Sequence, residues 1–446
     1  MRYLREIIHL SLPIFMANLA LMGGAVVDTI WLGRYSSLGL AAMSVSFAIY
    51  ASIYGLCLGL LRGARQLLAQ AHGSKSHINL LHNMQQSILF LFLMGLLAAI
   101  ITAWCATHLY FFGVSLNMIP IAREYLLVLA CGLPLQLFYR FFHMLAQVTN
   151  QAYRVVQFNI AGLIIRSLLS GSLIYGIAGL PELGAVGSAY ALVLNTCLLL
   201  PIFLYYTPSI ANCSIWKILL PFNRPDLKAI RSILHIGVPS AMSTFADLLS
   251  SSAAITVIAG IGLVASASHQ IVSNLNGLLY LLHVALSSAC GILVSHKIGE
   301  NDQATAKKIA WLGIQLNTFL ALLIMLSILL LRHDIAMLYT SDAIIQSAVV
   351  PLLVIVCIYH FSDAQSTIIG ELLCCWKSTI LASAIHIVVF CIGSLFLGWY
   401  LAKFGWHWGF YIEPMGVSGF WIMVTITSFI AVALNSFLLY SVFKQA

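Results

Sequence analysis

Charge is what this sequence has least of. Of its 446 residues, 21 are Lys or Arg and 13 are Asp or Glu, so charged residues make up 8% of the chain. Soluble domains carry about 25%, which excludes a cytosolic multidomain protein. Apolar residues make up 61%, and a membrane-spanning helix needs about 20 of them in a row. The chain therefore has room for about a dozen spans and for no sizeable soluble domain.

Motifs of catalysis and of cofactor binding are also missing. No Ser/His/Asp grouping, glycine-rich phosphate loop or metal-ligand spacing is visible, and the 10 cysteines fall mostly inside apolar runs. We expect neither an enzyme nor a bound cofactor. The basic excess fits loops that flank membrane helices better than it fits a nucleic-acid partner. Without a nucleotide-binding motif, an ion gradient is the expected energy source for any transport.

The apolar runs predict an all-α integral membrane protein with twelve transmembrane helices. Fifteen basic residues fall on one side of these spans, and four (Arg34, Arg123, Arg332 and Lys403) fall on the other. This asymmetry puts both termini in the cytoplasm, together with loops at 63–82 and 295–308. The expected spans are 10–33, 38–61, 84–112, 121–147, 154–178, 184–206, 233–259, 263–294, 309–331, 345–370, 378–402 and 415–442.

An internal repeat divides the chain. LREIIHLSLP, which starts at Leu4, is echoed by IRSILHIGVP, which starts 226 residues later at Ile230. We expect two six-helix lobes related by a pseudo-two-fold axis along the membrane normal: residues 1–206, a cytoplasmic linker at 207–232, and residues 233–446. Transporters are often built this way. A duplication kept only for stability is the alternative.

Three aspartates lie inside the predicted spans, where a charge costs about 2.5–3.5 kcal/mol on insertion scales. They are Asp28, Asp247 and Asp363, and the alternative for each is a structural hydrogen bond to a neighbouring helix. At the repeat offset, Asp28 corresponds to Ala254 and Asp247 to Leu21. The two halves have therefore specialised.

Two further side chains in the tenth predicted span bear on these aspartates. Tyr359 precedes Asp363 by four residues, so the two share a helical face. Glu371 lies close to Lys377 in sequence and is expected to cap the cytoplasmic end of its helix.

Several strings resemble the multidrug and toxic compound extrusion (MATE) family, in particular its NorM-type bacterial branch. They include VVDTIWLGR (26–34), LLRGARQLLAQAHG (60–73), GLPLQLFYR (132–140), PELGAVGSAYA (181–191), ASHQIVSN (267–274), ILVSHKIGE (292–300) and YHFSDA (359–364). The resemblance covers essentially the whole chain. It implies two lobes around a cleft and export of amphipathic, mostly cationic drug-like compounds driven by Na⁺ or H⁺. It further implies a monomer in the bilayer of the bacterial cytoplasmic (inner) membrane.

The resemblance also implies roles for individual residues. Asp28 is then the acidic residue of the first lobe, whereas Asp247, Tyr359 and Asp363 form the cation-coupling site, with Na⁺ as a candidate ligand of Asp247 and Asp363. Asp247 departs from the family pattern, which usually has Glu there. Arg140, Asn195 and Asn274 are taken as supporting residues, and Arg140 has a structural role as its alternative.

Arg166 is a second departure, because the NorM-type branch tends to carry Asn at this position and at Ser170. A buried Arg needs a partner, and family geometry makes Asp28 the nearest candidate. We expect a salt bridge between them and a first lobe closed to Na⁺. The alternative is that Arg166 reaches the membrane interface or a water-filled cavity.

The chemistry of neighbouring carboxylates agrees with ion coupling. Two of them cannot both ionise cheaply, so a cation binds between them or one takes a proton. Two other functions remain open. A flippase for lipid-linked glycans would carry a positive cavity, whereas three Asp against two Arg within the spans favour cationic cargo. An integral-membrane enzyme would need a catalytic grouping that the sequence lacks.

Overall fold

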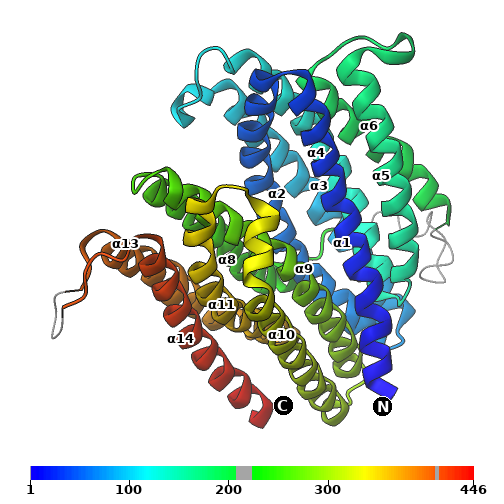
Figure 1. Ribbon diagram of the computed structural model, residues 1–446. Coiled ribbons are helices and arrows are strands. Elements are labelled where there is room, and N and C mark those ends of the chain that lie inside the picture. The colour runs from blue at the N-terminus through cyan, green and yellow to red at the C-terminus, as the bar shows by residue number, and fades with distance from the viewer. Residues whose placement is uncertain (1, 207–223, 407–410, 446) are drawn as a thin grey trace. The chain divides into compact units, whose positions relative to one another are not determined.

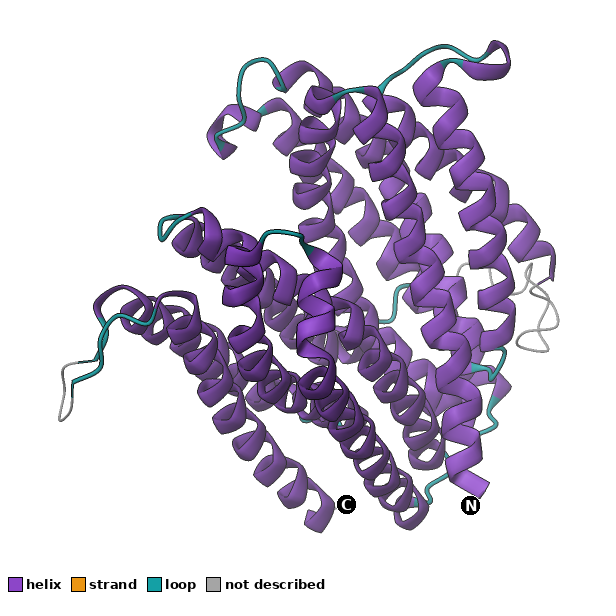
Figure 2. Cartoon of the chain, in the orientation of Figure 1, coloured by secondary structure: helices purple, strands orange, loops and turns teal. Residues whose placement is uncertain are grey.

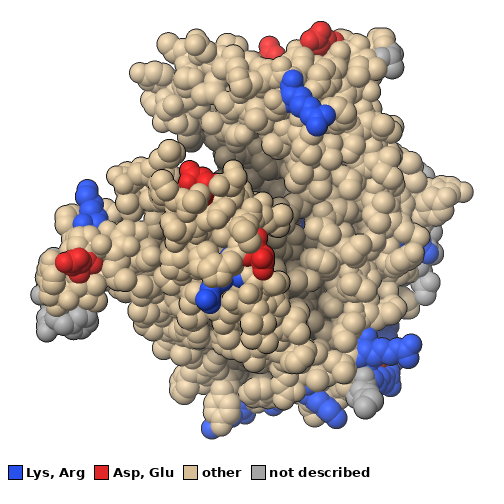
Figure 3. All heavy atoms as spheres, viewed as in Figure 1, with Lys and Arg blue, Asp and Glu red and all other residues tan. Residues whose placement is uncertain are grey.

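The computed structural model describes residues 2–206, 224–406 and 411–445, and these are almost entirely helical (Figures 1 and 2). Twelve of the described helical segments are long and apolar enough to cross a membrane. The all-α fold class and the twelve predicted spans are confirmed. Figure 3 shows how sparse Lys, Arg, Asp and Glu are on the surface that faces the viewer, as expected of a protein solvated by lipid.

The first compact unit comprises Leu12–Gly237. Its central helix is α4, which contacts α2, α3, α5 and α6, and Phe141 and Phe142 of α4 are fully buried. The helices of this unit are α1 (Arg2–Tyr35), α2 (Ser37–Gly73), α3 (His77–Thr107), α4 (Ile119–Val148), α5 (Ala152–Tyr175), α6 (Ala185–Tyr206) and the start of α8 (Leu227–Ala259).

The second compact unit comprises Met1–Ser11 and Val238–Ala446. Its central helix is α11, which contacts α9, α10, α12 and α14. Beside α8, the unit contains α9 (Leu263–Gly299), α10 (Gln303–Tyr339), α11 (Ala343–Cys375), α12 (Thr379–Ile385), the π-helical turn η4 (His386–Ile392), α13 (Gly393–Phe404) and α14 (Gly416–Gln445). The segments α12, η4 and α13 together make one membrane span.

The boundaries of these units differ from the expected lobes at two short segments. The first turns of α1 belong to the second unit, because Ile7 is fully buried among Leu286 and Cys290. Residues 233–237 belong to the first unit. A Cβ atom on Gly237 would lie 2.7 Å from the Leu60 carbonyl oxygen, so glycine is what lets α8 approach α2. Of the predicted linker, 207–223 lies outside the described residues and 227–232 is helical.

The expected cytoplasmic loops are mostly helical. α2 continues to Gly73 and α3 begins at His77, while only residues 300–302 separate α9 from α10. A helix of 37 residues is about 55 Å long, well beyond the hydrocarbon thickness of about 30 Å, so the spans continue into the polar region. Lys75 and Asn301 make the turns with left-handed φ angles of 55° and 60°.

Glu371 is not a surface cap. Its side chain is 6% exposed, and its carboxyl group occupies the space that the missing side chain of Gly291 leaves on α9. A Cβ atom at Gly291 would lie 2.5 Å from Glu371 Oε1. The sequence interpretation failed because hydropathy does not distinguish a polar residue facing a glycine from one facing water.

Asp226 fixes the start of α8. Its carboxylate accepts a hydrogen bond from the Lys228 backbone N–H at 2.8 Å and lies 3.1 Å from His82 Nε2 on α3. Its own N–H donates to Gln86 at 2.9 Å. The hydrogen bond from Lys228 and the one with His82 favour the charged form and hold the pKa of Asp226 below its usual value. This carboxylate therefore anchors α8 to α3 within the first unit.

Candidate functional site

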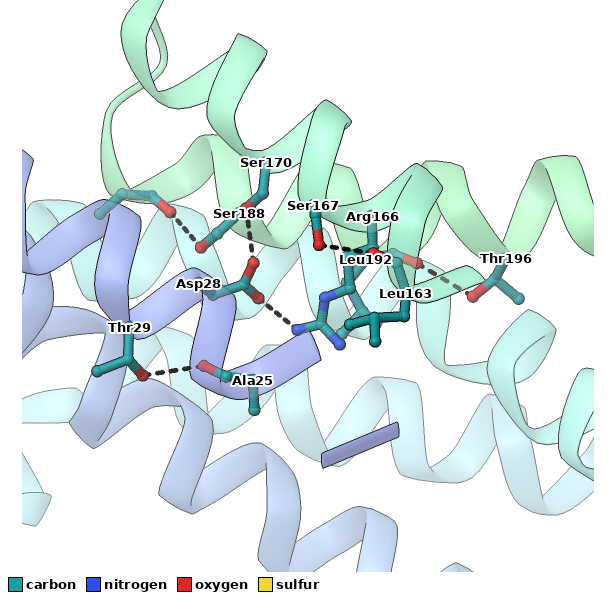
Figure 4. A network of polar contacts seen from close by, with 11 residues as sticks. Ala25, Asp28, Thr29, Leu163, Arg166, Ser167, Ser170, Ser188, Leu192 and Thr196 are labelled. Atoms are coloured by element: carbon teal, nitrogen blue, oxygen red, sulfur yellow. Dashed lines mark hydrogen bonds and ion pairs between the residues drawn. The ribbon is translucent and has the colours of Figure 1, made fainter. Parts of the chain in front are cut away.

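Asp28 lies in a polar site of the first unit, between α1 and α5 (Figure 4). It is only 2% exposed. Arg166 Nη2 donates to Asp28 Oδ2, forming an ion pair, and Ser170 Oγ donates to Asp28 Oδ1 at 2.6 Å. Both carboxylate oxygens thus have donors, and the donors come from residues one turn apart on α5. The structure places in contact the two residues that the sequence predicted to pair.

Gly24, one turn before Asp28 on α1, makes room for the guanidinium group. A Cβ atom there would lie 3.0 Å from Arg166 Nη1 and 3.2 Å from its Cδ. Arg166 is 11% exposed, and its Nε atom is buried without a hydrogen-bond partner among the described residues. The guanidinium group is therefore directed at Asp28 and not toward solvent.

Arg140 and Asn195, the supporting residues of the first unit, are not hydrogen-bonded to Asp28. Arg140 lies on α4 near Tyr54, Tyr139 and His143, where its charge acts on their side chains. Its Nη1 atom is buried and lacks a hydrogen-bond partner in the described part of the chain, as does Oδ1 of Asn195. Asn195, on α6, packs against Gly162 of α5.

Asp247 anchors the site of the second unit. Its Oδ1 atom lies 2.7 Å from His386 Nε2 and accepts a hydrogen bond from the Cys391 thiol at 3.5 Å. Asp247 lies on α8, whereas His386 and Cys391 stand at the start and near the end of η4. The carboxylate oxygen, the imidazole nitrogen and the thiol sulfur lie within 4.8 Å of one another.

The π-helical turn explains how His386 and Cys391 reach the same carboxylate. In an α-helix of 3.6 residues per turn, positions five apart point about 140° away from each other. The wider π-helix forms i→i+5 hydrogen bonds and brings such positions onto one face, and π-helical turns are frequent at functional sites. Sequence periodicity predicts an ordinary α-helix here. The one sequence signal for this site was His386 itself, because an ionisable side chain within an apolar run is unusual.

Tyr359 and Asp363 lie on α11, near Asp247. The charges of Asp247 and His386 both act on Asp363, and the side chain of Asn276 lies close to its carboxyl group. Tyr359 is 8% exposed and within electrostatic reach of both aspartates. The structure thus brings together the three predicted residues of the cation site.

An aromatic side chain joins the two halves of this site. Phe390 of η4 stacks on Tyr359, with ring centroids 6.4 Å apart, and on His386, with centroids 5.0 Å apart. The edge of Trp421 on α14 meets the Tyr359 ring at 5.3 Å. These contacts hold the tyrosine and the histidine in fixed positions relative to each other.

Asn274, the predicted supporting residue of the second unit, lies elsewhere. Its Oδ1 atom accepts a hydrogen bond from the Tyr339 hydroxyl at 3.0 Å. Asn276 is the amide that reaches Asp363. Two residues along a helix correspond to a rotation of about 200°, so Asn274 lies on nearly the opposite face of α9 from Asn276, which is the residue near Asp363.

The donor set at Asp247 restricts its chemistry. One carboxylate, one imidazole and one thiol suit a proton or a borderline-soft metal such as Zn²⁺. At Asp28, by contrast, Arg166 is a cation that does not lose its proton in proteins. The two units thus differ: one aspartate is paired with a fixed charge and the other with a charge that can titrate.

Known proteins resemble this chain over almost its whole length. The MatE family model matches residues 13–170 and 239–399, two segments whose starts lie 226 residues apart, as in the repeat. The probable multidrug resistance protein NorM of Mannheimia succiniciproducens is 26% identical, with 99% of this chain and 94% of the relative covered. Multidrug resistance protein MdtK of Pectobacterium atrosepticum is 27% identical, with 94% of this chain and 91% of the relative covered.

Solved structures agree on the fold. The outward-facing conformation of a multidrug resistance MATE family transporter of the MOP superfamily superposes with a TM-score of 0.87 at 17% identity, over 99% of this chain and 97% of the other. A MOP superfamily transporter from Pyrococcus furiosus, described as having a binding pocket of reverse polarity, gives a TM-score of 0.88 at 17% identity, over 99% and 96%. With twelve membrane helices, the repeat and a matching family model over both halves, the chain belongs to the MatE (multidrug and toxic compound extrusion) family of transporters.

Proposed function

We propose that this protein exports amphipathic, mostly cationic drug-like molecules across the bacterial cytoplasmic membrane in exchange for protons. Family membership and the names of the NorM and MdtK relatives support multidrug efflux. We further propose that the chain works as a monomer in the bilayer, with both termini in the cytoplasm. Fifteen basic residues on one side of the spans support this orientation.

The contact between Asp247 and His386, at 2.7 Å, is the observation that supports proton coupling. A protonated His386 neutralises Asp247 with a cation that the protein itself supplies. When His386 loses its proton, Asp247 keeps its negative charge and is free to bind a cationic substrate. Proton and drug thus compete for one carboxylate, which is what antiport requires.

Sodium coupling fits this site less well. Na⁺ needs oxygen ligands, but the partners of Asp247 Oδ1 are the His386 nitrogen and the Cys391 sulfur. In the first unit Asp28 already has a permanent cation in Arg166. We therefore place the coupling ion in the second unit, at Asp247 and Asp363.

Efflux from proteoliposomes tests this proposal. We expect a pH gradient to drive efflux of a fluorescent cationic dye, and a Na⁺ gradient at constant pH to drive none. Asp247→Asn and His386→Gln should each slow pH-driven efflux about tenfold or more, within the usual range for coupled sites. Asp334→Asn, at an exposed position on α10, is the matched control. Efflux driven by Na⁺ alone, or wild-type rates in His386→Gln, would refute proton coupling at this site.

One observation favours a second candidate, a flippase for lipid-linked glycans. Arg140 Nη1 is buried and has no hydrogen-bond partner among the described residues, and such a group would suit an anionic head group. In that case Arg140→Gln would abolish movement of a fluorescent pyrophosphate lipid between leaflets. If wild-type proteoliposomes move the dye but not the lipid, this candidate is rejected.

A further inference from the structure

Asp247, His386 and Cys391 bring three different metal-ligand atoms together in the second unit. Asp247 Oδ1 lies 2.7 Å from His386 Nε2 and 3.5 Å from Cys391 Sγ, and all three atoms lie within 4.8 Å of one another. No other group of three or more His, Cys, Asp or Glu side chains in the described part of the chain brings its ligand atoms this close. The mechanism proposed above uses the carboxylate and the imidazole and leaves the thiol without a role.

These distances suit a tetrahedral zinc ion. Zinc binds oxygen and nitrogen ligands at about 2.0–2.2 Å and thiolate sulfur at about 2.3 Å, so ligand atoms around it are about 3.3–3.6 Å apart. The distance of 3.5 Å between oxygen and sulfur already matches. The distance of 2.7 Å between oxygen and nitrogen is that of a direct hydrogen bond, and it must widen by about 0.6 Å to admit the ion. The Asp247 side chain, which is 47% exposed, has room for this movement.

The π-helical turn η4 presents His386 and Cys391 to the same ion. In metalloprotease helices, two histidines four residues apart bind zinc from one face of an α-helix. His386 and Cys391 are five residues apart, and the i→i+5 period of the π-helix gives them the same relation. Asp247, on α8, completes the set from a second helix. This local geometry is why the sequence shows no metal-ligand spacing.

The donor set selects the kind of metal. Mg²⁺ and Ca²⁺ prefer oxygen ligands, whereas imidazole and thiolate favour zinc and similar transition metals. Three protein ligands leave the fourth position of a tetrahedral ion to water. An ionised carboxylate is costly to expose to lipid, so the exposed side of Asp247 faces water. A hydrated ion therefore enters from the Asp247 side, since Cys391 is only 3% exposed.

Binding exchanges protons for the metal, because zinc takes the thiolate and the neutral imidazole. The S–H bond of Cys391 breaks, its proton passes to water, and a bond between sulfur and zinc forms. A His386 that is protonated on both nitrogens also gives its Nε2 proton to water, so that the Nε2 lone pair faces the ion. Two protons then leave for each Zn²⁺ that binds, and the net charge of the cluster does not change.

We propose that Asp247, His386 and Cys391 form a zinc-binding site whose occupation stops export. Zinc takes the carboxylate and the imidazole that the proposed function assigns to the proton and the drug, so neither can bind while the ion is present. Metal binding follows from the geometry of the three side chains, whereas the block of export rests on the proposed function.

Cobalt(II) spectroscopy of the purified, full-length protein tests the site without transport. Tetrahedral Co²⁺ gives visible ligand-field bands, and a bound thiolate adds a near-ultraviolet charge-transfer band. We expect both in the wild type, and their loss when Zn²⁺ is added. Cys391→Ser should lose the charge-transfer band, whereas Cys197→Ser, at an exposed cysteine of the first unit, is the matched control and should keep it. A wild type without this band, or a band that persists in Cys391→Ser, would overturn the proposal.

Thermal unfolding adds a comparison that needs no variant. A ligand that binds only the folded protein raises its unfolding temperature, so Zn²⁺ should stabilise the wild type and Mg²⁺ at the same concentration should not. Equal stabilisation by both ions would refute a site built from nitrogen and sulfur. Loss of an outer partner of a metal ligand typically costs about 10–100-fold in affinity. Asp247→Asn and His386→Gln each remove a direct ligand, so each should weaken Zn²⁺ binding about 100-fold or more.

Efflux separates this inference from the proposed function. In proteoliposomes, Zn²⁺ should inhibit pH-driven dye efflux by the wild type. Inhibition of Cys391→Ser, measured against its own zinc-free rate, should need about 100-fold more Zn²⁺. Efflux that continues at Zn²⁺ concentrations that displace all bound Co²⁺ would refute the block. If the wild type shows no pH-driven efflux but binds Co²⁺ through Cys391, the proposed function fails and the metal site stands.

Discussion

The ion pair between Arg166 and Asp28 gives the sharpest energetic prediction. Removing one partner of a buried pair typically costs about 3–5 kcal/mol, because the other charge is left buried and unpaired. Arg166→Leu leaves Asp28, which is 2% exposed, with Ser170 as its remaining side-chain donor. Asp28→Leu leaves the guanidinium group, 11% exposed, packed against Gly24 without its carboxylate partner. Each single variant should therefore be strongly destabilised.

The double variant should be more stable than the sum of the single effects predicts. With both charges replaced by leucine, no buried ion remains, and apolar replacement of a buried pair is often neutral or stabilising. We expect a coupling energy of about 2–3 kcal/mol, at the upper end for residues in contact. The assay is thermal unfolding of the purified protein in one detergent, with wild type, both single variants and the double variant measured side by side.

Additivity would refute this reasoning. If the single effects sum to the double effect within about 0.5 kcal/mol, Arg166 and Asp28 are not energetic partners. Ser170→Ala is the matched control, because it removes one 2.6 Å hydrogen bond to Asp28 and no charge. Its cost should be that of a hydrogen bond to a charged group, about 1.5–3 kcal/mol, and smaller than that of Arg166→Leu.

Three further outcomes follow from the structure. Gly24→Ala should lower the unfolding temperature because its Cβ atom would lie 3.0 Å from Arg166 Nη1, and an unchanged temperature would mean that the guanidinium group moves freely. Asp226→Asn should destabilise the protein at neutral pH and not at acid pH: the pKa of Asp226 is lowered on folding, so its stabilisation is present above the unfolded value and lost as pH falls through the folded one. Equal destabilisation at both pH values would contradict this. Single cysteines at Ser74 and Asn301, in the exposed turns, should react with a membrane-impermeant thiol reagent only from the cytoplasmic side. Labelling from outside would overturn the orientation.

The sequence by itself determined that this is an all-helical membrane protein and that its helices form two repeats. Hydropathy is a local property, since each span must satisfy its own backbone hydrogen bonds inside lipid, and runs of apolar residues therefore located all twelve helices. The repeat also extends to the central helices that the structure shows: α11 begins at Ala343, close to the 226-residue offset from the start of α4 at Ile119. The pairing of Arg166 with Asp28 was also predicted, because a buried guanidinium group needs a partner and the resemblance to the family makes Asp28 the nearest acidic candidate.

Which other polar side chains meet was decided only by the tertiary structure. His386 and Cys391 reach Asp247 because η4 is a π-helical turn, a local geometry that hydropathy does not encode. Asn276 rather than Asn274 faces Asp363, which depends on the rotation of α9 about its axis. The imidazole rings of His283 on α9 and His360 on α11, 77 residues apart in sequence, meet through their Nε2 atoms. These contacts depend on helix rotation and packing, which hydropathy does not encode.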